Sequence, residues 1–170
     1  AEGSAHLYAQ KANSGNLGDR EFTFVLKSGA NEIQTKTGIR AGKAATFDTL
    51  TYTLADLNGA NGKTFTYYIR EAQDGLPGVD YDTKVETVTI YVRDNHEGKL
   101  EVTYGDQTNR TFVTPEFRNT YTAEGKAELQ ARKARDQRLG DNVFTFVLRS
   151  EDGNEVETKT IKQGETATFT

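Results

Sequence analysis

Apolar and polar residues alternate along most of this chain, in short segments that turn residues separate. Successive side chains of a β-strand point to opposite faces, so alternation predicts strands with one buried and one exposed face. Turn signals include Asn58-Gly59, Asn61-Gly62 and the segment 94–98, which is predicted to close a hairpin. The pattern predicts strands near residues 5–12, 21–28, 32–37, 44–54, 63–72, 84–93, 99–104 and 110–121. Many short strands at regular spacing favour a sandwich or a partly open barrel.

Three of these predicted strands each place one polar, reactive side chain on an otherwise apolar face. The three residues are Lys11, Glu71 and Asn119. Their predicted apolar face neighbours are Leu7 and Ala9 for the lysine, Phe65, Tyr67 and Ile69 for the glutamate, and Phe117 and Tyr121 for the asparagine. We therefore expect all three polar side chains to point inward.

An amine, a carboxylic acid and a carboxamide are together sufficient to form a new amide bond. Burial lowers the pKa of a lysine and favours its nucleophilic neutral form. The same burial raises the pKa of a glutamate, which would let Glu71 donate to the amide oxygen and shuttle protons. From physics alone an ion pair between Lys11 and Glu71, with Asn119 filling a remaining hydrogen bond, is equally favoured.

The chain also contains an internal repeat. AHLYAQKANSGNLGDREFTFVL returns as AELQARKARDQRLGDNVFTFVL, so that Lys133 takes the position of Lys11. We interpret residues 1–123 as one complete repeat and residues 124–170 as the N-terminal part of a second, truncated repeat. Residues 124–138 have the composition of a helix, but their repeat counterpart does not, and we therefore predict a strand there. Alone, the truncated copy is expected to be frayed, cleaved or completed by a neighbouring molecule.

Composition narrows the class of protein. Val, Thr, Tyr and Phe are frequent and Pro is rare, which favours an all-β fold. The net charge of -4 argues against binding to nucleic acid or to an anionic membrane. No apolar run is long enough for a membrane span, and a signal or anchor is expected outside this fragment, which contains no Met. The absence of Cys excludes disulfides, thiolate metal sites and cysteine nucleophiles.

Few other residues are candidates for binding. His6 and His96 lie at outward or turn positions, so we expect neither a metal site nor a cofactor. The basic residues between 126 and 138 could form an anion-binding strip, although a solvated strand face is the favoured interpretation because acidic residues interrupt them. This cluster consists of Lys126, Arg132, Lys133, Arg135 and Arg138.

The order of motifs carries a family resemblance. A lysine ending the first strand is followed by EFTFVL, YYIREA, VDYDTK, VTIYV and FRNTY. This series resembles the isopeptide-linkage domain of Gram-positive pilins and surface adhesins, of the streptococcal major-pilin type, over about residues 5–121 in full and 127–169 in part. The resemblance implies an immunoglobulin-like, pilin- or CnaB-like β-sandwich whose first and last strands are parallel neighbours.

The resemblance also implies roles for the three inward residues. Lys11 and Asn119 would form an intramolecular isopeptide bond, and Glu71 would promote it. Lys133 matches the lysine position of the next repeat, whose glutamate and asparagine would lie beyond Thr170, so no second bond is expected.

The expected function is that of a structural stalk module in a cell-wall-anchored, extracellular adhesin or pilus. Its partners would be neighbouring repeats of the same polypeptide. Bond formation would occur once per molecule, so the chain is not expected to be an enzyme. An adhesive module that binds a host protein or glycan remains the alternative.

Overall fold

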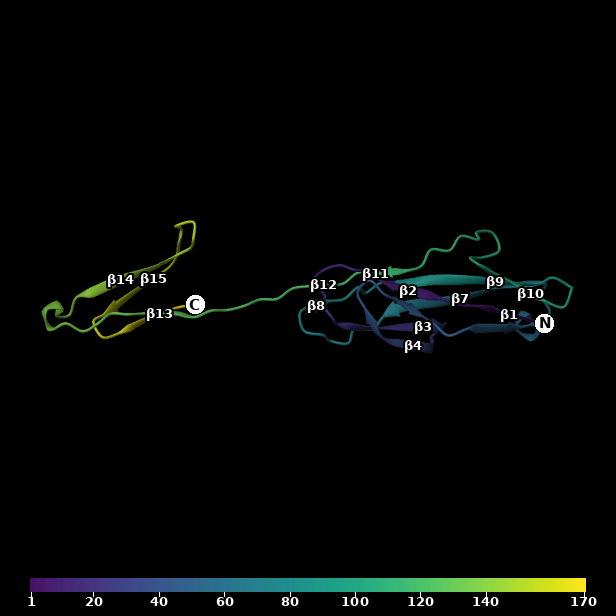
Figure 1. The fold of residues 1–170 in the computed structure, drawn as a ribbon, viewed down its shortest axis with the longest axis horizontal. Coiled ribbons are helices and arrows are strands. Elements are labelled where there is room, and N and C mark those ends of the chain that lie inside the picture. Colours follow the sequence, from purple (N-terminus) through teal and green to yellow (C-terminus); the bar gives the residue numbers. More distant parts are fainter. The chain divides into compact units, whose positions relative to one another are not determined.

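The computed structural model describes all 170 residues, and nearly all of its regular structure is β-strand (Figure 1). The chain divides between Thr122 and Ala123 into two compact units, residues 1–122 and 123–170. Each unit has its own hydrophobic cluster. The predicted all-β class is therefore confirmed.

The main sheet of the first unit consists of five antiparallel strands in the order β10-β9-β7-β3-β4. All five lie where strands were predicted, although three consecutive residues are buried both in β3 (24–26) and in β9 (90–92), and Asp94 leads into the predicted hairpin turn. The strands are β3 (Glu21–Ser28), β4 (Asn31–Arg40), β7 (Gly62–Glu71), β9 (Val85–Asp94) and β10 (Leu100–Tyr104).

The remaining strands of the first unit are shorter and form smaller sheets. One sheet has the order β11-β2-β5, and two further pairs are β1-β6 and β12-β8. β11 runs parallel to β2, which confirms the expected parallel pairing between the first and last predicted strands, 5–12 and 110–121. The bounds are β1 (Glu2–Ala5), β2 (Tyr8–Lys11), β5 (Ala44–Thr46), β6 (Leu50–Thr53), β8 (Val79–Asp80), β11 (Glu116–Phe117) and β12 (Thr120–Tyr121), with a 3-10 helix η1 (Leu54–Leu57) after β6.

Three predicted strands were too long. The segments 5–12 and 44–54 each break in two, because β1 pairs with β6 whereas β2 pairs with β5 and β11. Segment 110–121 is extended as a strand only at β11 and β12. Its first part follows a turn in which the Asp106 carboxylate accepts hydrogen bonds from the backbone N–H groups of Thr108 and Asn109. Pro115, just before β11, has no N–H that could donate to a neighbouring strand. Alternation alone could not show where a strand changes partner.

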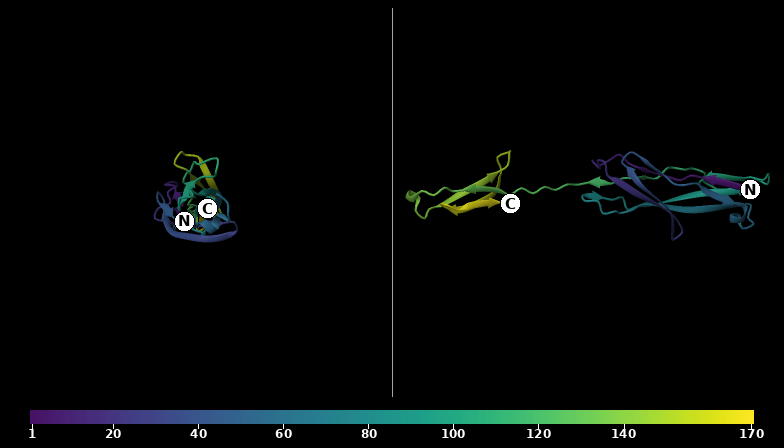
Figure 2. Two further views of the ribbon diagram at one scale, coloured as in Figure 1. Left: turned by 90° about the vertical axis from the view of Figure 1, so that its right-hand side faces the viewer. Right: turned by 60° about the horizontal axis from the view of Figure 1, so that its bottom comes forward.

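The core of the first unit joins the main sheet to the shorter strands. Phe22, Leu26 and Ile69 come from the main sheet. Leu7 lies just before β2, and Phe117 lies in β11. All five are fully buried in one continuous cluster. Contact between residues of opposing sheets is the packing of a β-sandwich, and Figure 2 shows the strands running along the length of this unit.

The second unit consists of two antiparallel pairs, β13-β16 and β14-β15. The predicted strand within 124–138 is confirmed as β13. The elements are β13 (Leu129–Arg132), a 3-10 helix η2 (Gln137–Leu139), β14 (Val143–Arg149), β15 (Glu155–Lys162) and β16 (Thr166–Phe169). Its buried cluster is small and consists of Ile161, Ala167 and Phe169.

Strand pairings of the first unit recur in the second. Ala9 is opposite Ala45 in the first unit, and Ala131 is opposite Ala167 in the second. Each residue of the second pair follows its counterpart by 122 positions (131 minus 9). The same offset relates the pairing of Phe22 with Ile39 to that of Phe144 with Ile161. These pairings support the tandem-repeat interpretation, which remains a prediction.

Gly3 provides a test of the packing between β1 and β10. A Cβ atom at this position would lie 2.5 Å from Val102 Cγ2 and 3.1 Å from Leu100 Cβ. We expect Gly3→Ala to lower the free energy of unfolding of the first unit by about 1–3 kcal/mol, because the two strands must separate. Urea titration followed by tyrosine fluorescence reports on this unit alone, since all 8 tyrosines lie within it.

The matched control is Gly125→Ala, because a Cβ there has no neighbour within 4 Å. This variant should unfold at the urea concentration of the parent. Equal midpoints for the two variants would show that β1 and β10 do not pack this closely.

Candidate functional site

The structure brings Lys11, Glu71 and Asn119 together inside the first unit. They are the buried polar or charged residues of the chain, exposed by 0%, 3% and 0% respectively. Lys11 Nζ lies 3.2 Å from Glu71 Oε2, and Asn119 Nδ2 donates to Glu71 Oε1 at 2.6 Å. One carboxylate therefore contacts both the amine and the carboxamide.

Strand pairing explains this convergence. The parallel pair β2-β11 places Lys11 opposite Phe117, and Ala12 N–H donates to the carbonyl oxygen of Phe117 at 2.9 Å. Asn119 lies two residues beyond Phe117, at the end of that pairing. The β3-β7 register places Glu71 opposite Phe24, at the end of the neighbouring main-sheet strand.

The amine of Lys11 lies beside an aromatic ring of the core. Lys11 Nζ lies 4.5 Å from the centre of the Phe22 ring, and the rings of Phe24 and Phe117 meet edge to face at 5.2 Å. Lys11 Nζ also lies 3.4 Å from the carbonyl oxygen of Phe117. No buried side-chain nitrogen or oxygen atom of the chain is left without a hydrogen-bond partner. The polar groups are thus satisfied by one another within an apolar environment.

This environment favours the neutral forms of both ionisable groups. Burial lowers the pKa of Lys11 below its ordinary value, and the nearby Glu71 only partly opposes that effect. Burial raises the pKa of Glu71, against the hydrogen bond from Asn119 and the charge of Lys11. A neutral amine and a protonated acid are the forms that an attack on a carboxamide requires.

Asp82 fixes the orientation of the carboxamide. Its backbone N–H donates to Asn119 Oδ1 at 2.8 Å. Because a backbone N–H can only donate, the oxygen of the amide must face Asp82 and its nitrogen must face Glu71. The expectation that Glu71 donates to the amide oxygen is therefore wrong for this arrangement, since Glu71 contacts the nitrogen.

Sequence reasoning assigned no role to Asp82. The residue stands in the motif VDYDTK, which was the only available signal. Its contact with Asn119 is made by the backbone N–H. Every residue except proline has this group, so the residue type does not indicate the contact. The structure adds Asp82 to the three residues that the sequence indicated.

Lys133 lies in the second unit beside an aromatic ring in the same way as Lys11. Its Nζ lies 4.2 Å from the centre of the Phe144 ring. Its backbone N–H donates to the backbone carbonyl oxygen of Glu165 at 3.0 Å, as the backbone N–H of Lys11 donates to that of Lys43 at 2.8 Å. No carboxylate forms an ion pair with Lys133, and its side chain is only partly buried. The lysine environment is therefore present without the acid and the amide.

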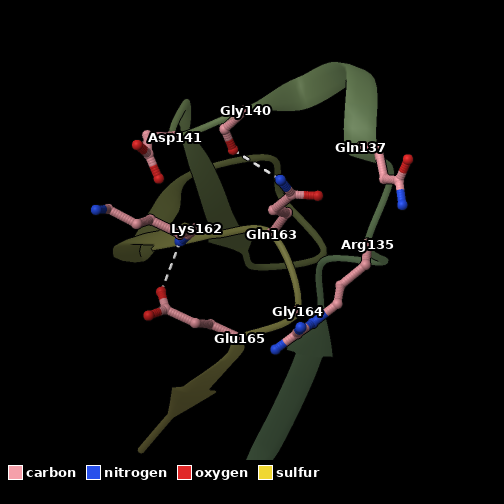
Figure 3. A pocket seen from close by; sticks show the side chains of 8 residues that line it. All are labelled: Arg135, Gln137, Gly140, Asp141, Lys162, Gln163, Gly164 and Glu165. Carbon is pink, nitrogen blue, oxygen red and sulfur yellow. Dashed lines mark hydrogen bonds between the residues drawn. The ribbon is translucent and has the colours of Figure 1, made fainter.

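A polar pocket of about 550 Å³ lies in the second unit (Figure 3). Gln163 Nε2 donates to the carbonyl oxygen of Gly140 at 2.7 Å, and Lys162 N–H donates to the Glu165 carboxylate at 2.6 Å. The lining residues are Arg135, Gln137, Gly140, Asp141, Lys162, Gln163, Gly164 and Glu165. Because it mixes both charges and its polar groups bond to one another, this pocket does not favour the anion-binding interpretation of the basic cluster.

No three His, Cys, Asp or Glu side chains are grouped so that they could hold a metal ion. His6 lies 3.3 Å from the Thr49 hydroxyl, and His96 lies 3.3 Å from Asp94.

None of the helices has the length and apolar character needed to cross a bilayer.

Comparison with known proteins gives one family. The model of the FctA family, described as the Spy0128-like isopeptide containing domain, matches residues 7–122. This range includes Lys11, Glu71, Asp82 and Asn119. No curated protein matches the chain in sequence.

Solved structures with detectable similarity include two major pilins of Streptococcus pyogenes. The pilin T3.2 from serotype GAS13637 is 17% identical, with a TM-score of 0.41 over 98% of this chain and 74% of that protein. The pilin T-13 from serotype GAS131465 is 19% identical, with a TM-score of 0.38 over 98% of this chain and 72% of that protein.

Proposed function

We propose, from the fact that this chain belongs to the family of Spy0128-like isopeptide-containing domains, that its first unit cross-links itself once through Lys11 and Asn119. Members of this family are structural domains of the Gram-positive pilin type and are not enzymes. The cross-linked unit would serve as a stalk module of a cell-wall-anchored pilus or adhesin, in series with neighbouring modules of the same polypeptide. The observation that carries the proposal is the contact of Glu71 with both reacting groups.

The reaction replaces one amide with another. The neutral Nζ of Lys11 attacks Cγ of Asn119, a bond forms between these two atoms, and the bond from Cγ to Nδ2 breaks. Glu71 accepts the proton that Nζ loses, at Oε2, and delivers a proton from Oε1 to the departing nitrogen, which leaves as ammonia. Each carboxylate oxygen already contacts the nitrogen that it would serve.

The position of the bond suits a stalk. It would connect β2 with the segment that follows β11, so tension applied to the chain ends would pass through the bond and bypass the intervening strands. Asn119 follows Lys11 by 108 positions (119 minus 11). If the loop entropy of disulfides applies, closing this loop contributes about 4–5 kcal/mol, which is large beside a typical domain stability of roughly 5–15 kcal/mol.

Binding of a host protein or glycan has no comparable observation in its favour. The reactive side chains of Lys11, Glu71 and Asn119 are buried and so present no surface to a ligand. Lys133 would stay unreacted, because neither an acid nor a carboxamide is held beside it.

Intact mass tests the proposed bond. We expect the purified chain to be lighter than its sequence mass by about 17 Da, the ammonia lost on amide formation. Lys11→Ala, Asn119→Ala and Glu71→Ala should each have the full sequence mass. Lys133→Ala is the matched lysine control and should keep the deficit. A parent chain at full mass would reduce the three residues to a buried polar network.

The rate of bond formation should depend on pH as a bell-shaped curve. The rate should be highest when the reacting pair holds one proton, because a second proton would leave Lys11 as an ammonium, and without any proton Glu71 could not act as an acid until it had taken one from Nζ. Burial lowers the pKa of Lys11 from 10.5 and raises that of Glu71 from 4.5, so neither limb of the curve should lie at the ordinary pKa of its group.

The measurement starts from linear chain, purified in urea and verified by its mass. This chain is diluted into buffers of different pH, and the cross-linked fraction is followed by mass over time. A rate that stays constant from pH 4.5 to pH 10.5 would rule out this proton requirement.

A further inference from the structure

We propose that Asp82 completes the reaction centre in two ways. Its backbone N–H stabilises the negative charge that develops on Asn119 Oδ1, and its carboxylate positions that N–H against the strand that carries the asparagine. This inference rests on the proposed cross-link. It assigns a hydrogen-bond donor to Asn119 Oδ1, which Glu71 does not contact.

The oxygen of the carboxamide needs a donor. When Nζ of Lys11 attacks, Cγ becomes tetrahedral and Oδ1 gains negative charge. Glu71 cannot serve this atom while its two oxygens contact Lys11 Nζ and Asn119 Nδ2. The Asp82 N–H, at 2.8 Å from Oδ1, is already directed at the oxygen inside a buried site, where a fixed donor is most effective.

The Asp82 side chain holds the loop to the segment that bears Asn119. Its Oδ2 accepts from the backbone N–H of Arg118 at 2.9 Å, and its Oδ1 accepts from the backbone N–H of Lys84 at 3.2 Å. Asp82 therefore contacts Asn119 through its own N–H and contacts the preceding residue through its carboxylate. These two contacts fix the distance between the donor and the amide.

Neighbouring residues anchor the same loop. Lys84 Nζ donates to the carbonyl oxygen of Glu116, in β11. Tyr81 accepts a hydrogen bond from Leu76 N–H at 3.1 Å, and its ring packs edge to face against Phe22, the ring beside Lys11. The donor is thus held by contacts on both sides, as a group that acts without rearrangement must be.

The backbone N–H can be removed without changing the side chain. In cell-free translation, malic acid replaces Asp82 and converts the N–H into an ester oxygen. Loss of one oxyanion donor costs enzymes roughly 100- to 1000-fold in rate, so we expect cross-linking to slow by at least about 100-fold. Samples quenched in denaturant at successive times are scored for linear and cross-linked chain by gel mobility and mass.

Side-chain variants separate the positioning role from the donor role. Asp82→Ala removes the acceptor for Arg118 N–H and should slow the reaction roughly tenfold or more. Asp82→Asn keeps a side-chain oxygen as the acceptor and should recover most of the rate. Asp80→Ala changes a nearby exposed carboxylate and should react as the parent does.

Each variant is also prepared with Lys11→Ala, in which no bond can form, and its thermal unfolding is measured to verify that the unit folds. If the parent chain forms no bond, the proposed function fails and this inference fails with it. If the parent reacts and the malic acid variant reacts at the same rate, the oxyanion role is overturned while the cross-link stands. Equal slowing of Asp82→Ala and Asp82→Asn would overturn the positioning role of the carboxylate.

Discussion

The arrangement of the first unit depends on one buried carboxylate. Glu71 stands at the end of β7 and is hydrogen-bonded through one oxygen to Lys11 and through the other to Asn119, which lie near opposite ends of the first unit. The parallel pairing of β2 with β11 supplies the geometry, because β2 ends at Lys11 and β11 ends two residues before Asn119. Without Glu71 the lysine and the carboxamide would be buried with neither a proton acceptor nor a proton donor between them.

The buried pair of Lys11 and Glu71 carries a cost in lost hydration, which formation of the isopeptide bond would remove. Burying a lysine beside a glutamate is favourable only if their attraction offsets the loss of hydration, and it often does not. Burial accordingly favours the neutral forms of both Lys11 and Glu71. An isopeptide bond would turn the lysine permanently into an uncharged amide, so that the fold would no longer hold a buried ammonium. In this account the burial that disfavours the charges of Lys11 and Glu71 also promotes the reaction.

Much of this could be predicted from the sequence, because strand alternation specifies which side chains share a face. Lys11, Glu71 and Asn119 were recognised as inward for that reason, and β13 was predicted against its helix propensity because its repeat counterpart is a strand. The positions where strands change partner were not predictable, since His6 and Leu7 continue the alternation while β1 and β2 join different sheets. Asp82 was missed because it acts through a backbone N–H. The orientation of the Asn119 amide depends on that same contact.

Pulling on single molecules is the sharpest test of the cross-link, because the proposed covalent bond would span the first unit. Chains held at both ends are stretched, and the parent is compared with Lys11→Ala. The variant should release the 108 positions from residue 11 to residue 119 as a step of on the order of 350–390 Å, the extended length of that many residues. The parent should show no such step at any force that unfolds the variant. A step of the same length in the parent would mean that no bond joins Lys11 to Asn119 and would contradict the account.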